Sequence, residues 1–212
     1  MSSPDTLPVV ETVRLWDPLL RLFHWALAFC VVFAWGLGMF GPDVMTLHFI
    51  VGYAVAGLLA FRLVWAVFGP RPARFASFVY GPAAILRYLR DVGARRPSGW
   101  RGHNPLGGLY ILVLLSALAA QVLTGLLADP EDYINVGPLA GLVPPAVSRM
   151  ALFWHDAIAT ALLGLVVLHL AAIGFYRVWK REDLIRPMIT GWKTCVMPGP
   201  DAGNRGDRHA AP

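Results

Sequence analysis

The 212-residue chain has few charges and few cysteines. Charged residues make up 15% of it, against roughly 25% in a typical soluble domain. A disordered chain needs high charge and low hydrophobicity, so disorder of the whole chain is excluded. Cys30 and Cys195 cannot form a disulfide framework, and neither belongs to the Cys-x-x-Cys-His motif that attaches a c-type haem. Apolar residues, by contrast, are abundant, at 57% of the chain with eight Trp and eleven Phe.

Four long apolar stretches account for this hydrophobicity. They cover residues 19–40, 44–68, 106–127 and 151–179, and they contain few charges. About 20 apolar residues cross a hydrocarbon core of about 30 Å, so each stretch is long enough to span a membrane. Helices buried in a soluble protein would show polar faces, which these stretches lack. The sequence therefore predicts an all-α integral membrane protein, a bundle of four transmembrane helices.

The remainder of the chain is expected to form connections and flexible ends. Residues 1–13 and 199–212 are expected to be disordered, which leaves 14–198 as a single four-helix domain. Pro82–Val92 predicts a short helix that lies on the membrane surface or, alternatively, an ordinary solvated helix. The first residues lack the basic start and the cleavage site of a secretory signal, so the first span is expected to remain in the mature protein.

Basic residues are concentrated on one side of the predicted bundle. The two ends of the chain and the connection between spans two and three together hold 14 Lys and Arg, whereas the other side holds Arg149 alone. Cytoplasmic segments carry the excess of Lys and Arg in membrane proteins. Both termini are therefore expected in the cytoplasm. The net charge of +5 then reflects topology, and no nucleic-acid partner is expected.

Four of the six histidines lie inside the predicted spans: His24, His48, His155 and His169. Ionisable side chains at membrane depth are costly, which makes each one a candidate for function. His155 and His169 are 14 residues apart, so they share one helix face at a separation of about 21 Å, one near each side of the membrane. Because neighbouring spans run in opposite directions, His48 is expected level with His155, and His24 level with His169.

Facing histidines at two depths suit two planar metal cofactors. Haem b is the best candidate, because imidazoles can occupy both axial positions of its iron. A structural zinc site needs four ligands at one point, and no Met or Cys cluster accompanies the histidines to indicate copper. We therefore predict two haems b, with the ligand pairs His24/His169 and His48/His155. The alternatives are a polar network between helices, or a cofactor-free scaffold or transporter with histidine proton relays.

The motifs around these histidines are similar to those of one known family over nearly the whole chain. They are Arg14-Leu-Trp-Asp-Pro-Leu-Leu-Arg-Leu-Phe-His24-Trp25, Leu47-His48-Phe-Ile-Val-Gly-Tyr53, Phe61-Arg62-Leu-Val-Trp65, Gly102-His103-Asn-Pro-Leu-Gly-Gly108, Trp154-His155-Asp156 and Leu168-His169-Leu170. In combination they resemble the bacterial cytochrome b561 and nickel–iron-hydrogenase-type cytochrome b family. The resemblance implies a four-helix membrane cytochrome with two haems b on the same four histidines. It also implies electron transfer between quinone and a redox partner.

Arg62 and His103 are further candidates for cofactor binding. Arg62 lies 14 residues after His48, hence on the same helix face and near the inner end of its span. Its guanidinium could pair with a propionate of the inner haem or extend to the membrane surface. His103 lies in a Gly-His-Asn-Pro turn and could bond a propionate or a quinone, or be an interfacial turn residue. Gln121 and Thr124 are expected to hydrogen-bond a neighbouring helix.

Given the resemblance, the sequence favours an electron-transfer cytochrome of a respiratory chain over a stand-alone oxidoreductase. We expect it to lie among the lipids of a bacterial inner membrane and to exchange electrons between quinone and a periplasmic c-type cytochrome or other redox protein. The alternative is a superoxide:quinone oxidoreductase of the same fold. Two axial imidazoles leave no open position on an iron, and the acidic outer connection 129–150 would repel superoxide.

Overall fold

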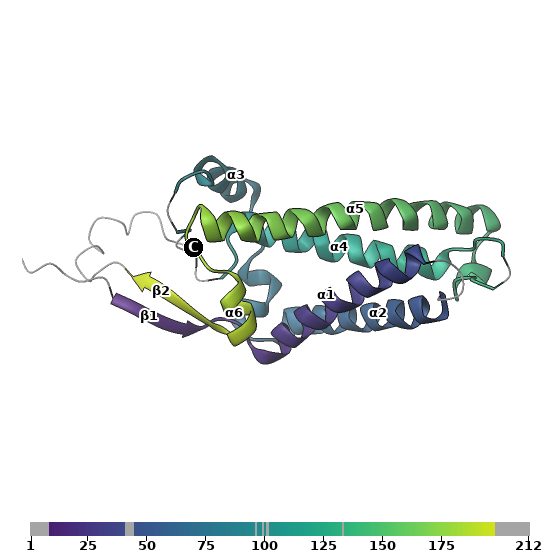
Figure 1. Cartoon of the computed structure of the whole chain (residues 1–212), viewed down its shortest axis with the longest axis horizontal. Coiled ribbons are helices and arrows are strands. Elements are labelled where there is room, and N and C mark those ends of the chain that lie inside the picture. Colours follow the sequence, from purple (N-terminus) through teal and green to yellow (C-terminus); the bar gives the residue numbers. More distant parts are fainter. Residues whose placement is uncertain are drawn as a thin grey trace, which may run out of the picture.

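The computed structural model describes residues 9–40, 45–95, 97–98, 100, 102–132 and 134–197. Within them the elements are, in chain order, β1 (Val9–Arg14), α1 (Pro18–Met39), α2 (Met45–Phe68), η2 (Arg71–Ala73), η3 (Phe75–Ser77), α3 (Pro82–Asp91), α4 (Pro105–Leu127), η4 (Ala140–Leu142), α5 (Pro145–Val178), α6 (Ile185–Thr190) and β2 (Trp192–Met197). The long helices α1, α2, α4 and α5 run along the long axis of the molecule (Figure 1).

These four helices are long and apolar enough to cross a membrane, which confirms the prediction of a four-helix membrane bundle. Their outward side chains are apolar; Phe29, for example, is 67% exposed. Contiguous exposed apolar surface of this kind is suited to lipid rather than to water. α5 begins at Pro145 instead of residue 151, because proline is well tolerated in the first turn of a helix. With 34 residues α5 is about 51 Å long, so it projects beyond a core of about 30 Å.

The bundle consists of two helical hairpins. α1 packs on α2, α4 packs on α5, and the two hairpins meet through α2 and α4. At one end of the bundle, α1 and α4 end while α2 and α5 begin; we call this the hairpin end. The opposite end carries β1, β2, α3 and α6, and we call it the sheet end (Figure 1). The assignment of the sheet end to the cytoplasm stays a prediction.

An antiparallel pair of strands lies at the sheet end. β1 pairs with β2, with Val9 opposite Met197 and Arg14 opposite Trp192. The expectation that residues 1–13 are disordered is therefore wrong for residues 9–13, because their pairing partner lies at the far end of the sequence, beyond the reach of local patterns. Residues 1–8 and 198–212 lie outside the described residues.

The start of α1 is tied firmly to the sheet end. Asp17 caps the helix, since its carboxylate accepts from the backbone N–H groups of Leu19 and Leu20, each at 3.0 Å. The other Asp17 oxygen accepts from Trp65 Nε1 of α2 at 3.2 Å. Gly191, at φ 87°, ends α6 in the left-handed region, and its carbonyl accepts from Leu15 N at 2.8 Å. These contacts fix the first turns of α1, and His24 with them.

Candidate cofactor site

The hairpin end brings together His48 of α2 and His155 of α5. Their ring centroids are 6.1 Å apart, and the ring planes are 77° apart. A metal about 2.0 Å from one nitrogen of each ring would place the two centroids about 6 Å apart. The separation of the two rings is therefore that expected for two imidazoles that bind one metal.

Hydrogen bonding fixes the orientation of the His48 ring. Its Nδ1 lies 2.9 Å from the backbone carbonyl of Ala34 on α1. A carbonyl can only accept, so Nδ1 carries the hydrogen and Nε2 keeps its lone pair. Histidine ligands of metals commonly donate their second N–H to such a group, which fixes the tautomer and the ring. His48 is thus oriented in the manner of a metal ligand.

His155 is held by one face of α4. Its Nδ1 lies 3.0 Å from the backbone carbonyl of Gln121 and 3.3 Å from the hydroxyl of Thr124. Its Nε2 lies 3.1 Å from the side-chain amide nitrogen of Gln121, which donates to the lone pair. A Cβ at Gly125 would lie 2.8 Å from His155 Cε1, so only glycine leaves room for the ring there. The expectation that Gln121 and Thr124 bond a neighbouring helix is confirmed, and their partner is a candidate ligand.

The second candidate pair, His24 of α1 and His169 of α5, lies nearer the sheet end. His24 is within electrostatic range of His169. Its Nδ1 is buried and has no hydrogen-bond partner among the described residues. A buried imidazole nitrogen without a partner is costly, and a metal would satisfy it. The His169 ring stacks on the ring of Tyr110 in α4, with centroids 5.8 Å apart and planes 4° apart. The Tyr110 hydroxyl donates to the Leu165 carbonyl, which holds the stacked ring in place.

Arg62 is buried at the sheet end of α2, with 4% of its surface exposed. Its Nη2 donates to the Ala73 carbonyl at 2.9 Å, and its guanidinium lies 4.7 Å from the centroid of the Phe75 ring. The alternative in which Arg62 extends to the membrane surface is therefore wrong, because η2 and η3 fold over the guanidinium. Its Nη1 has no partner within the described part of the chain. That N–H is a free donor for an anionic group.

His103 is half-buried close to Arg62, between two aromatic rings. Its ring centroid lies 4.6 Å from that of Trp16 and 4.9 Å from that of Phe78. Burial, and then the positive charges of Arg62 and Lys193, lower the pKa of His103 to about 4, so the ring is neutral at pH 7. Its Nδ1 has no partner among the residues that the structure describes. The structure thus gathers Arg62 and His103 into one cluster, and each contributes one buried nitrogen without a partner among the described residues.

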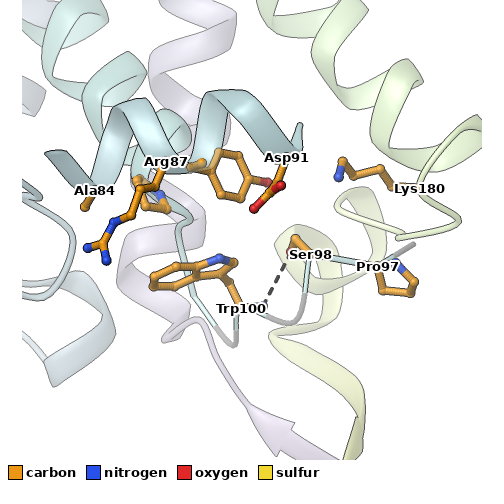
Figure 2. A pocket seen from close by; sticks show the side chains of 9 residues that line it. Ala84, Arg87, Asp91, Pro97, Ser98, Trp100 and Lys180 are labelled. Carbon is orange, nitrogen blue, oxygen red and sulfur yellow. Dashed lines mark hydrogen bonds between the residues drawn. The ribbon is translucent and has the colours of Figure 1, made fainter. Parts of the chain in front are cut away.

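A separate cavity of about 280 Å³ also lies at the sheet end. Arg87 and Asp91 of α3 line one side, with Ser98 and Trp100 across from them and Lys180 at a third side (Figure 2). None of the six candidate site residues lines this cavity. It is therefore distinct from the histidine pairs.

The sequence assigned no role to Tyr110 and did not connect Gln121 with His155. The sequence does indicate that Gln121 faces a partner. Gln121, Thr124 and Gly125 lie three and four residues apart and so share one face of a helix. A polar face on an otherwise apolar span marks the side that meets a functional group. Its partner on α5 is decided only by the way the helices pack.

Fold and site together define a class: a membrane-embedded helical bundle with two imidazoles spaced as two ligands of one metal. Within the described ranges, no three His, Cys, Asp or Glu side chains converge to hold a metal ion, so a multi-ligand zinc site is not found there.

Comparison with known proteins agrees with this class of protein. A family profile described as prokaryotic cytochrome b561 matches residues 15–191. A "Probable Ni/Fe-hydrogenase B-type cytochrome subunit" of Azotobacter chroococcum mcd 1 is 27% identical, covering 89% of this chain and 91% of the relative. A protein of the same description from Azotobacter vinelandii is 26% identical over the same shares. The chain belongs to the prokaryotic cytochrome b561 family. It is a membrane electron-transport protein with haem b, as the sequence predicted.

Proposed function

We propose that this cytochrome holds two haems b, one between His48 and His155 and one between His24 and His169. The observation that carries the proposal is the 6.1 Å separation of the His48 and His155 rings, together with the carbonyl-fixed tautomer of His48. The buried, unpartnered Nδ1 of His24 supports the second pair. Because His155 and His169 share α5, the two haems would lie at two depths in one electron path across the membrane.

Haem b supplies the reversible one-electron step, and the protein supplies ligands, orientation and electrostatics. Nδ1–H groups that donate to the carbonyls of Ala34 and Gln121 fix the tautomers of His48 and His155 and leave each Nε2 with its lone pair. For His155 to use Nε2 as a ligand, the Gln121 amide has to move aside. At the sheet end, Arg62 Nη1 can donate to a propionate, and neutral His103 can hydrogen-bond the same group.

The charge asymmetry supports one orientation of the protein in the membrane. We place the sheet end in the cytoplasm of a bacterial inner membrane, because basic residues concentrate there. The hairpin end then faces the periplasm and is acidic. Its Arg149 pairs with Glu131 at 3.0 Å, and both side chains are exposed. An acidic surface favours docking of a basic patch on a periplasmic c-type cytochrome or other redox protein.

Quinone is the proposed exchangeable partner within the membrane. The curated relatives are described as hydrogenase cytochrome subunits, which supports a redox enzyme as the second partner. We therefore propose that the two haems connect such an enzyme with membrane quinone in a respiratory chain.

Haem counting in single histidine variants tests the ligand pairs. Extraction of haem from the purified protein should give two per chain, and His48→Ala and His155→Ala should each leave one, with the same spectrum in both variants. His24→Ala and His169→Ala should leave the other haem. His209→Ala, at a histidine with no proposed role, is the matched histidine control and should retain both. One haem per chain in the unaltered protein, or loss of the same haem from His24→Ala and His48→Ala, would contradict the proposal.

A further inference from the structure

The short helix α3 presents two different faces. Arg87, Tyr88 and Asp91 line the cavity on the side that faces the bundle. Leu86 and Leu89 lie on the opposite face, since each residue turns a helix by about 100°. These leucines are 57% and 42% exposed. An amphipathic helix therefore turns its polar face inward and its apolar face outward, the reverse of a helix on a soluble protein.

The depth of α3 follows from its connections to the spans. The hydroxyls of Tyr88 in α3 and Tyr176 in the last turn of α5 are 2.6 Å apart. Just beyond α3, the Gly93 and Ala94 carbonyls accept from Trp179 Nε1 at 2.8 Å and from Lys180 Nζ at 3.2 Å. Trp179 and Lys180 directly follow the end of α5. α3 is thus fixed at the level of the last turn of α5, where the Tyr176 hydroxyl also accepts from Asn104 Nδ2, just before the start of α4, at 3.0 Å.

The start of α4 gives the same level. α4 begins at Pro105, which lines the cavity beneath α3, and it spans 23 residues or about 34 Å. A helix of that length crosses a hydrocarbon core of about 30 Å and little more. Its first residue therefore lies at the interface between hydrocarbon and headgroups. The apolar face of α3 is continuous in depth with the lipid-facing surface of the spans.

Charge on α3 complements lipid headgroups. Arg90 follows Leu86 by four residues and borders the apolar face, and it is exposed. Helices that lie in the interface carry basic residues beside an apolar face, which is held by buried area and by attraction to anionic lipids. We infer that α3 is an in-plane membrane anchor: Leu86 and Leu89 enter the lipid interface at the sheet end, and Arg90 contacts anionic headgroups. The inference is independent of the haem ligands.

Site-directed spin labelling in nanodiscs tests the anchor. Leu86→Cys and Leu89→Cys, in a background with Cys30→Ala and Cys195→Ala, would carry a nitroxide on the full-length protein. Val167→Cys is the lipid-facing control on α5, and Asp91→Cys is the control on the polar face of α3. We expect the labels at 86 and 89 to collide readily with oxygen and poorly with a water-soluble nickel chelate, as the label at 167 does. The label at 91 should collide readily with the nickel chelate and less with oxygen.

Two other patterns would overturn the inference. High nickel accessibility at 86 and 89 would mean that the face meets water. Low accessibility to both reagents, in discs that hold one protein molecule, would mean that protein covers the face. A second variant tests the headgroup contact: Arg90→Gln should reduce the immersion of label 89 in phosphatidylglycerol discs and leave it unchanged in phosphatidylcholine discs. If Arg90→Gln leaves the immersion of label 89 unchanged in phosphatidylglycerol discs as well, Arg90 does not contact the headgroups.

Discussion

Replacement of Gln121 by leucine tests the geometry of the hairpin-end site most directly. The Gln121 amide donates to His155 Nε2 at 3.1 Å, the lone pair that the proposed iron would use. The Oε1 of the same amide is buried without a partner among the described residues. Gln121→Leu removes the competing donor and the unsatisfied oxygen, and it keeps the backbone carbonyl that holds His155 Nδ1.

The size of the effect follows from the lost hydrogen bond. A net hydrogen bond contributes about 1 kcal/mol, which corresponds to roughly fivefold in a binding constant. We therefore expect Gln121→Leu to bind the hairpin-end haem about fivefold more tightly. The measurement is an absorbance titration of protein stripped of haem, in a His24→Ala background that isolates the hairpin-end pair.

Thr124→Val is the matched control one turn along α4. It removes a hydroxyl that lies 3.3 Å from His155 Nδ1 and leaves the Nε2 contact in place, so haem affinity should stay the same or fall. Circular dichroism of each variant checks that the helices are retained. Unchanged or weaker haem binding by a folded Gln121→Leu variant would refute the idea that the amide competes for Nε2.

Four further predictions concern charge, pH, topology and reactivity. Arg62→Leu removes a positive charge near the proposed sheet-end haem, which favours the oxidised state of that haem. A redox titration should therefore show its midpoint potential lowered by about 40 mV, the equivalent of about 1 kcal/mol. An unchanged midpoint potential of both haems would contradict a contact between Arg62 and a propionate. Because the pKa of folded His103 is depressed to about 4, the stability it contributes is present above its unfolded pKa of about 6.5 and is lost as pH falls from there towards 4. Thermal unfolding at several pH values should show this loss of stability, about 3 kcal/mol at most, and the loss should be smaller in His103→Gln. If the unaltered protein and His103→Gln lose equal stability in acid, His103 is not the group responsible. A reporter fused to the C-terminus should be active only if it requires the cytosol, whereas periplasmic activity would invert the orientation. The purified protein should accelerate superoxide loss little, and rapid superoxide consumption coupled to quinone reduction would promote the oxidoreductase alternative.

The membrane class and the spacing of the four histidines along their spans follow from the sequence alone. Apolar length decides whether a segment spans a bilayer, because unpaired backbone groups are not tolerated in hydrocarbon and a helix satisfies them within itself. The placement of His155 and His169 on one face is equally local, since it depends only on the helical period. The family resemblance rests on short motifs around the same histidines. These features need no knowledge of which helix packs on which.

Contacts between distant segments were decided only by the tertiary structure. Residues 9–13 of β1 have no local signal for a strand, because their pairing partner, β2, lies at the other end of the described chain. Arg62 faces Phe75 instead of the membrane surface because η2 and η3 fold back over it. The Gln121 amide reaches His155 through the α4–α5 contact, across more than thirty residues of sequence. Such contacts depend on the orientation of whole helices, which is set by the sum of their buried surfaces and not by any local pattern.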